Sequence, residues 1–154
     1  MPPVQLVRTT SDNADFRALV VLLDQYLRVL DGDEHAFYAQ FNKTALLHHV
    51  VVAYRGKEPV GCGAFKEYEA DAVEIKRMFV RPADRGQGIA QAVLAELERW
   101  AREAGYAACV LETGKKQPEA IRLYEKSGYA FTPNYGQYVG VENSVCLRKE
   151  LDSR

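Results

Sequence analysis

One stretch of the chain decides its fold and reads Arg81-Pro82-Ala83-Asp84-Arg85-Gly86-Gln87-Gly88-Ile89-Ala90. It follows a segment dense in apolar residues and precedes the clearest helical pattern in the sequence. The first N–H groups of a helix have no partners inside it and lie at the positive end of its dipole. Consecutive amides over residues 86–90 therefore predict an anion site that suits a pyrophosphate. Gly86 and Gly88 lack side chains that would obstruct the anion, and Arg85 adds a positive charge.

The same glycines also suit a tight turn without a ligand, and the residues alone leave that alternative open. Two other phosphate loops do not fit. A Walker loop needs Lys followed by Ser or Thr where the chain has Ile89 and Ala90, and a dinucleotide fingerprint needs glycine where Gln91 stands. A dinucleotide-binding module is kept as an alternative that titration with NADH would test.

The residues around this loop predict one mixed α/β sheet. Alternating or β-branched runs predict strands at residues 4–8, 49–54, 60–66, 72–80, 107–112, 129–131 and 141–149. Helical spacing predicts helices from a cap at Asp12 and Asp15 to Asp31-Gly32, at 33–41, from Ile89 to a stop at Gly105, and at 118–126. Short polar connections favour an antiparallel meander for the second to fourth strands.

Size and composition favour a single domain without nucleic-acid, membrane or metal binding. The 154 residues suit one core, and 20 Lys and Arg against 21 Asp and Glu give no basic field for nucleic acid. Cys62, Cys109 and Cys146 form no Cys-x-x-Cys pair, and the three histidines lack metal-ligand spacing. We expect no leader, because the first residues lack a basic segment followed by an apolar core, and no membrane span, because no apolar run reaches about 18 residues. We expect a cytoplasmic protein.

The motif Arg85-x-x-Gly88-x-Ala90 resembles the acyl-CoA signature Gln/Arg-x-x-Gly-x-Gly/Ala of the GNAT superfamily of N-acetyltransferases. The flanks resemble it too, with Glu74-Ile75-Lys76-Arg77-Met78-Phe79-Val80 as its fourth strand and Ala120-x-x-Leu123-Tyr124-Glu125-Lys126-x-Gly128-Tyr129 as its next helix and strand. The similarity covers residues 60–132.

The resemblance implies a mostly antiparallel sheet of about seven strands with about four helices. That sheet would be splayed between its fourth and fifth strands, with acetyl-CoA as co-substrate and its pantetheine arm in the gap. Main-chain groups of Met78 and Val80 would pair with that arm as a neighbouring strand would. The implied cofactor residues are Met78, Phe79, Val80, Arg85, Gly86, Gln87, Gly88, Ile89, Ala90, Thr113, Gln117, Ala120 and Tyr124. Gln117 departs from the Asn that many members carry at its position.

Two residues are candidates for the chemistry. Attack of an amine on a thioester needs a base for the ammonium and an acid for the departing thiolate. Tyr124 occupies the family's general-acid position, and a phenol with a pKa of about 10 is protonated at neutral pH. Packing of an Ala120, Ile121 and Tyr124 face is its alternative. Glu74 matches the base of the histone-acetylating branch, and an ion pair with Lys76 from the same side of the strand is its alternative.

The resulting hypothesis is acetyl transfer to a primary amine by direct attack in a ternary complex. Alternatively, the domain is a non-catalytic acyl-CoA sensor that regulates a partner protein. The acidic residues 31–34 and the loop 134–138 are candidate contacts for the acceptor, with a solvated turn and simple loop packing as their alternatives. A small-molecule amine, a protein amine, a monomer and a homodimer all stay open. Cys109 is interpreted as a buried strand thiol rather than a nucleophile.

Overall fold

The computed structural model describes residues 3–32 and 46–151. The helix predicted at residues 33–41, and with it Asp33, Glu34 and His35, lies outside the described residues. The sheet consists of β1 (Gln5–Thr9), β2 (His49–Arg55), β3 (Glu58–Glu69), β4 (Ala72–Val80), β5 (Ala108–Gly114), β6 (Ala130–Thr132) and β7 (Ser144–Glu150). The helices are α1 (Ala14–Asp31), α3 (Ile89–Glu103) and α4 (Pro118–Lys126), with short 3-10 turns at η2 (Pro82–Asp84) and η3 (Gly136–Tyr138).

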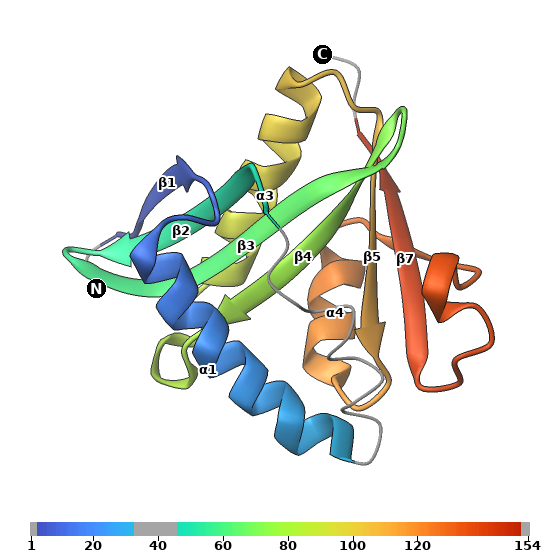
Figure 1. The fold of residues 1–154 in the computed structure, drawn as a ribbon, viewed down its shortest axis with the longest axis horizontal. Helices are drawn as coiled ribbons and strands as arrows, with labels where there is room; N and C mark the ends of the chain where they lie inside the picture. Colours follow the sequence, from blue (N-terminus) through green and yellow to red (C-terminus); the bar gives the residue numbers. More distant parts are fainter. Residues whose placement is uncertain (1–2, 33–45, 152–154) are drawn as a thin grey trace.

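The strands form a seven-stranded sheet in the order β1-β2-β3-β4-β5-β7-β6, and every neighbouring pair is antiparallel except β4 and β5 (Figure 1). The predicted mixed, mostly antiparallel sheet is therefore confirmed. The last strand in the chain, β7, is not at an edge of the sheet. It lies between β5 and β6, and the short β6 takes the edge position.

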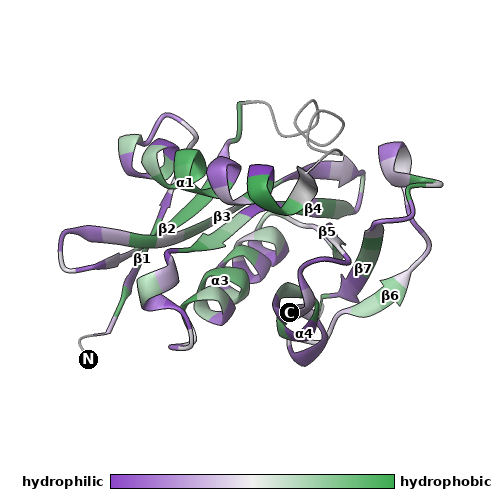
Figure 2. Ribbon diagram, turned by 90° about the horizontal axis from the view of Figure 1, so that it is seen from below, coloured by the Kyte–Doolittle hydropathy of each residue, from purple (hydrophilic) through white to green (hydrophobic). Residues whose placement is uncertain are grey.

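The helices cover both faces of the sheet (Figure 2). On one face α1 buries Phe16, Leu19 and Leu23 against Val52 and Phe79 of the strands. On the other face, α3 and Tyr124 of α4 pack in a larger apolar cluster that draws residues from several strands. The apolar spacing in the sequence predicts these stripes, because a helix buries the side chains that recur every three to four residues.

The start of α1 corrects the predicted cap. The side chain of Asn13, and not that of Asp12 or Asp15, accepts the hydrogen bond from the amide of Phe16. Asp15 lies in the first turn and instead accepts a 2.7 Å hydrogen bond from the hydroxyl of Tyr54 on β2. Asn is as good a cap as Asp, so local sequence could not choose among the three neighbouring residues.

The sheet opens between its two central strands. β4 and β5 pair only where Ala72, Val73 and Glu74 lie opposite Ala108, Cys109 and Val110. β5 pairs with β7 along all seven of its residues. Beyond Glu74, the side of β4 that faces β5 has no strand beside it. The predicted splay between the fourth and fifth strands is confirmed.

A bulge in β4 changes which side chains face the cleft. Arg77 and Met78 together lie opposite Gly63, and Arg77 has a left-handed φ of 60°. Such an extra residue interrupts the alternation of side chains along a strand. Met78 therefore packs on the α3 side of the sheet and not on the side of Glu74 and Lys76, where strict alternation along the strand would have placed it.

Candidate functional site

The loop that precedes α3 presents a run of unpaired amides. Among the described residues, no backbone carbonyl accepts a hydrogen bond from the N–H groups of residues 86–90, and the first such bond of α3 joins the amide of Ala92 to Gly88. Gly86 and Gly88 have left-handed φ angles of 78° and 79°, and a Cβ at either would meet no atom within 4 Å. Their conformation and the open space in front of them fit a bound diphosphate, which needs close approach of main-chain donors.

Arg85 lies at the edge of this loop with its guanidinium turned back over β4. Its Nε donates a 2.9 Å hydrogen bond to the carbonyl of Val80, and its guanidinium lies 5.1 Å from the ring centre of Tyr26 and 5.7 Å from that of Phe79. The aromatic contacts fix a positive charge where β4 ends. Arg85 therefore lies between the loop with the unpaired amides, residues 86–90, and the end of β4.

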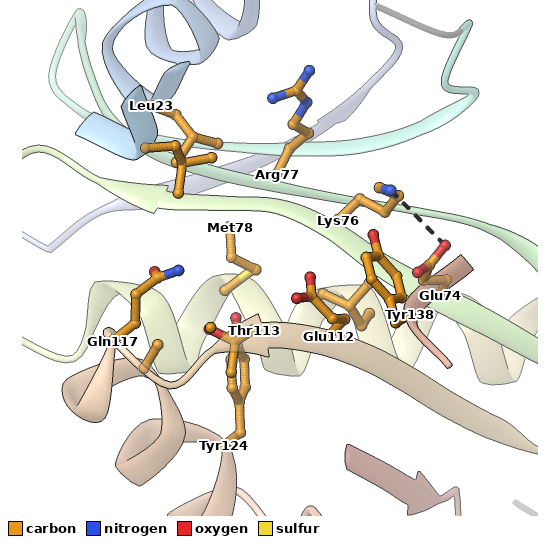
Figure 3. Close-up of a pocket in the computed structure, with 14 residues that line it drawn as sticks. Leu23, Glu74, Lys76, Arg77, Met78, Glu112, Thr113, Gln117, Tyr124 and Tyr138 are labelled. Carbon is orange, nitrogen blue, oxygen red and sulfur yellow. Dashed lines mark ion pairs between the residues drawn. The ribbon is translucent and has the colours of Figure 1, made fainter. Parts of the chain in front are cut away.

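A cleft lies along the split in the sheet, beside residues 74–78 of β4 (Figure 3). Its walls come from α1, β4, β5, α4 and the loop before β7. The lining residues are Leu23, Leu27, Glu74, Ile75, Lys76, Arg77, Met78, Glu112, Thr113, Gly114, Gln117, Ala120, Tyr124 and Tyr138. Four of these side chains are charged (Glu74, Lys76, Arg77 and Glu112), so the cleft is more polar than the mostly apolar pocket that is usual for a small molecule.

The cleft brings together some of the predicted cofactor residues and excludes the side chains of others. Met78, Thr113, Gln117, Ala120 and Tyr124 line it. The side chains of Phe79, Val80 and Ile89 are buried in the two apolar clusters, so these residues can offer only main-chain groups to a ligand. The side-chain oxygen of Gln87 accepts a 2.6 Å hydrogen bond from Arg55. The backbone amide of Gln87 belongs to the run of unpaired amides in the loop.

Glu74 lies where β4 and β5 begin to separate and is 4% exposed. Its Oε2 accepts a 2.8 Å hydrogen bond from the hydroxyl of Tyr135, and its Oε1 lies 3.8 Å from Lys66 Nζ and 4.0 Å from Lys76 Nζ. The two ammonium groups are at the outer limit of an ion pair, whereas the tyrosine contact is a close hydrogen bond. The carboxylate is held mainly by Tyr135.

Tyr124 reaches the same cleft from α4. In the close-up, it is labelled on one side of β5 and Glu74 on the other (Figure 3). Its ring packs edge-on against Tyr129 at 5.9 Å, so the predicted packing role is present. Burial raises the pKa of Tyr124, and the negative charge of Glu112 raises it further. The phenol therefore keeps its proton at neutral pH and beyond.

The structure adds site residues that the sequence reasoning missed. Glu112 on β5 lines the cleft, and its carboxyl group interrupts the otherwise apolar run of that strand, which was the available signal. Arg77 lines it as well and donates a 2.7 Å hydrogen bond to Asp24 of α1. No signal in the sequence marks Arg77, because its position depends on the bulge.

The loop 134–138 divides between the two roles considered for it. Tyr138 lines the cleft, and Tyr135 reaches Glu74. Asn134 instead donates to the carbonyls of Tyr138, Val141 and Ser144 at 3.0 to 3.2 Å, which holds the loop together. Loop packing is thus the role of Asn134, whereas Tyr138 lines the cleft and Tyr135 holds the buried carboxylate of Glu74.

Two further observations concern metals, membranes and thiols. Within residues 3–32 and 46–151, no three His, Cys, Asp or Glu side chains gather as metal ligands would, and no helix there is long and apolar enough to cross a bilayer. Burial raises the pKa of Cys109 to about 12, with the charge of Glu98 adding to it, so this strand residue stays a thiol as expected.

Comparisons with known proteins agree with this geometry. The model of the acetyltransferase (GNAT) family matches residues 16–129. An IAA acetyltransferase of Azospirillum brasilense is 35% identical over 153 residues, covering 98% of this chain and 100% of that protein. A Klebsiella pneumoniae crystal structure has a TM-score of 0.81 at 28% identity, covering 97% of this chain and 98% of that one.

A GNAT family acetyltransferase from Elizabethkingia anophelis, solved with acetyl-CoA bound, shares the fold. Its TM-score is 0.69 at 19% identity, and the alignment covers 98% of this chain and 100% of that one. The family predicted from Arg85, Gly88 and Ala90 is confirmed, and the expectation of acetyl-CoA as co-substrate is confirmed with it. The chain therefore belongs to the GNAT family of acetyltransferases and is an acetyl-CoA-dependent N-acetyltransferase.

Proposed function

We propose that the protein transfers an acetyl group from acetyl-CoA to a primary amine by direct attack in a ternary complex. The amides of residues 86–90 would bind the diphosphate, and main-chain groups of Met78 and Val80 would pair with the pantetheine arm. Thr113, Gln117 and Ala120 would line the path of that arm. When bound, acetyl-CoA supplies an activated acetyl group as a thioester.

The chain's own residues would manage the two protons of the reaction. Glu74, or a water that it holds, would take the proton of the acceptor ammonium, so that the amine nitrogen can bond to the thioester carbon. Tyr124 would donate its phenol proton to the sulfur as the carbon–sulfur bond breaks. The second proton that the nitrogen loses on becoming an amide would pass through solvent and restore the phenol. The products are an N-acetyl amide and the free thiol, and no covalent enzyme intermediate is formed.

The proposal is supported most by one observation: Glu74 and Tyr124 line the same cleft along β4, the strand whose end leads through residues 81–85 to the unpaired amides. The cleft narrows to the point where β4 and β5 start to pair, beside Glu74. A ligand anchored at residues 86–90 and extended along β4 would thus present its far end to both side chains. This arrangement favours catalysis over a sensor role.

The test is the variant Tyr124→Phe, which keeps the ring against Tyr129 and removes the phenol proton. We expect its kcat to fall by about a hundredfold, as is typical of the loss of a general acid, with little change in acetyl-CoA affinity. Turnover would be followed by thiol release and affinity by calorimetry. Tyr106→Phe, which loses a hydroxyl bonded to Glu67 away from the cleft, is the matched control. Equal losses in kcat and affinity would contradict the acid role.

The acceptor is addressed by the same thiol-release measurement with a panel of compounds. The panel would contain polyamines, amino acids, an amine antibiotic and a lysine peptide, which represent small-molecule and protein amines. IAA would be included because a relative 35% identical to the chain is named an IAA acetyltransferase. Acetyl-CoA binding without transfer to any amine in the panel would count against the proposal.

A further inference from the structure

We infer that Arg55 and Asp84, which lie outside the cleft, are positioning residues for the diphosphate-binding loop. They would act by joining the tip of the β2–β3 hairpin to the segment 81–87, two parts of the chain that lie at the same end of the molecule (Figure 1). The inference rests on the proposed binding of the diphosphate by residues 86–90. It assigns the shape of that loop to a set of side chains that cannot touch the ligand's reacting atoms.

Asp84 is the centre of the arrangement. It ends the turn η2, just before the amide run, and is only 6% exposed. One of its carboxylate oxygens accepts a hydrogen bond from Nη1 of Arg55, and the other accepts one of 3.1 Å from Nε of Arg81. Burial alone would raise the pKa of Asp84, but the hydrogen bonds from the two arginines outweigh it and hold the pKa below its ordinary value.

Arg55 continues the connection to the loop itself. While Nη1 bonds Asp84, Nη2 donates a 2.6 Å hydrogen bond to the side-chain oxygen of Gln87, which stands between Gly86 and Gly88. Arg81 makes a parallel connection, because its Nη2 donates at 2.9 Å to Glu58 at the start of β3. One planar guanidinium thus spans from the turn before the loop to the middle residue of the loop.

The position of Arg55 carries a cost that packing does not explain. Among the residues that the structure describes, its Nε is the single buried side-chain nitrogen or oxygen that lacks a hydrogen-bond partner. Buried polar groups are nearly always satisfied, and exceptions need an explanation. The guanidinium of Arg55 occupies this position although its Nε has no acceptor. This fits a side chain whose role is to make the contacts with Asp84 and Gln87.

The physical role follows from the backbone of the loop. Gly86 and Gly88 both adopt left-handed φ angles. No atom lies within 4 Å of the position that a Cβ would take at either residue. A glycine-rich segment with no packing would sample many conformations, and each would direct the amides differently. Holding Gln87 between the two glycines restricts that freedom, so less entropy is lost when the diphosphate binds.

The experiment compares Arg55→Met with the wild-type protein. Methionine keeps the apolar stem of the side chain and leaves Asp84 paired with Arg81. We expect the acetyl-CoA Kd by calorimetry to rise about tenfold, the scale of a lost supporting contact, with kcat at saturation unchanged. S-acetylpantetheine, a thioester without a diphosphate, should be turned over at the wild-type rate. Lys57→Met, which removes a positive charge from the same exposed hairpin tip, is the matched control and should keep the wild-type Kd.

A second variant keeps the inference testable if Arg55→Met does not fold. Arg55→Lys preserves the charge but offers no planar fork to span Asp84 and Gln87, so its Kd should also rise. An acetyl-CoA Kd at the wild-type value in either folded variant would overturn the inference and leave the proposed function standing. An equal loss with S-acetylpantetheine would overturn it as well, because the effect would not involve the diphosphate. Failure of the wild-type protein to bind acetyl-CoA would instead overturn the proposed site.

Discussion

The hydroxyl of Tyr135 donates a 2.8 Å hydrogen bond to Oε2 of Glu74, joining a loop before the last strand to the strand at the centre of the sheet. The two residues are 61 positions apart in the chain. Burial raises the pKa of Tyr135, and the negative charge of Glu74 and the hydrogen bond to it raise that pKa further. The phenol therefore remains a donor over the whole working range of pH, and Glu74 keeps a fixed orientation in the cleft.

Replacing Tyr135 with Phe should lower both activity and stability. The buried carboxylate of Glu74 would lose its close donor, which costs about 1.5 to 3 kcal/mol of unfolding free energy for a hydrogen bond to a charged group. The kcat/KM for the acceptor should fall by up to about a hundredfold, because Glu74 would no longer be held in one orientation toward the amine. Urea unfolding and steady-state kinetics measure the two effects. Tyr68→Phe, at a ring that lies tilted against that of Tyr135 with 4.8 Å between the ring centres, should change neither by as much.

The pH dependence of turnover tests Tyr124 as the acid. Because burial and then the charge of Glu112 raise its pKa above the usual value of about 10, the phenol should hold its proton through mildly alkaline pH. With both substrates saturating, kcat should show no falling limb between about pH 7 and pH 9.5. A decline of kcat in that interval that is absent from Tyr124→Phe would contradict the prediction.

Gly88→Ala should weaken acetyl-CoA binding more than it weakens the fold. An L-residue at a φ of 79° costs about 1 kcal/mol of unfolding free energy, and no neighbouring atom would clash with the new Cβ. The Cβ would instead stand in front of the amides, so the acetyl-CoA Kd should rise by about tenfold or more. Gly105→Ala has the same kind of backbone strain at a φ of 94° beyond α3 and is the control for binding. Calorimetry and thermal melts separate the two effects.

A buried charge cluster predicts a stability effect away from the cleft. Glu98 of α3 is 5% exposed and accepts hydrogen bonds of 2.9 Å from the hydroxyl of Tyr129 and from Nζ of Lys149. Lys149→Met would leave that carboxylate without its counter-charge and should cost about 2 kcal/mol of unfolding free energy. Adding Glu98→Gln removes the orphaned charge and should recover part of the loss in urea unfolding. A double variant less stable than Lys149→Met would show that the charge pair is not the cause.

Several elements could be predicted because their determinants are local. The helix from Ile89 follows from apolar spacing, and the amide loop before it follows from Gly86 and Gly88 at a strand-to-helix junction. The cap of α1 was placed on Asp12 and Asp15 instead of Asn13, since neighbouring residues of equal capping strength cannot be ranked locally. The bulge at Arg77 left no local mark, because it arises where two residues of β4 must match Gly63 on β3.

Local sequence was enough to predict the seven strands, the three helices among the described residues, the loop that suits a diphosphate, and the family of the chain. Spacing and short motifs carry this information, since they act between residues close together in the chain. Only the tertiary structure decided that β7 lies inside the sheet, that Tyr135 rather than Lys76 holds Glu74 most closely, and that Arg55 reaches Gln87. These contacts join residues far apart in the chain, and their distances exist only once the sheet has paired and opened between β4 and β5.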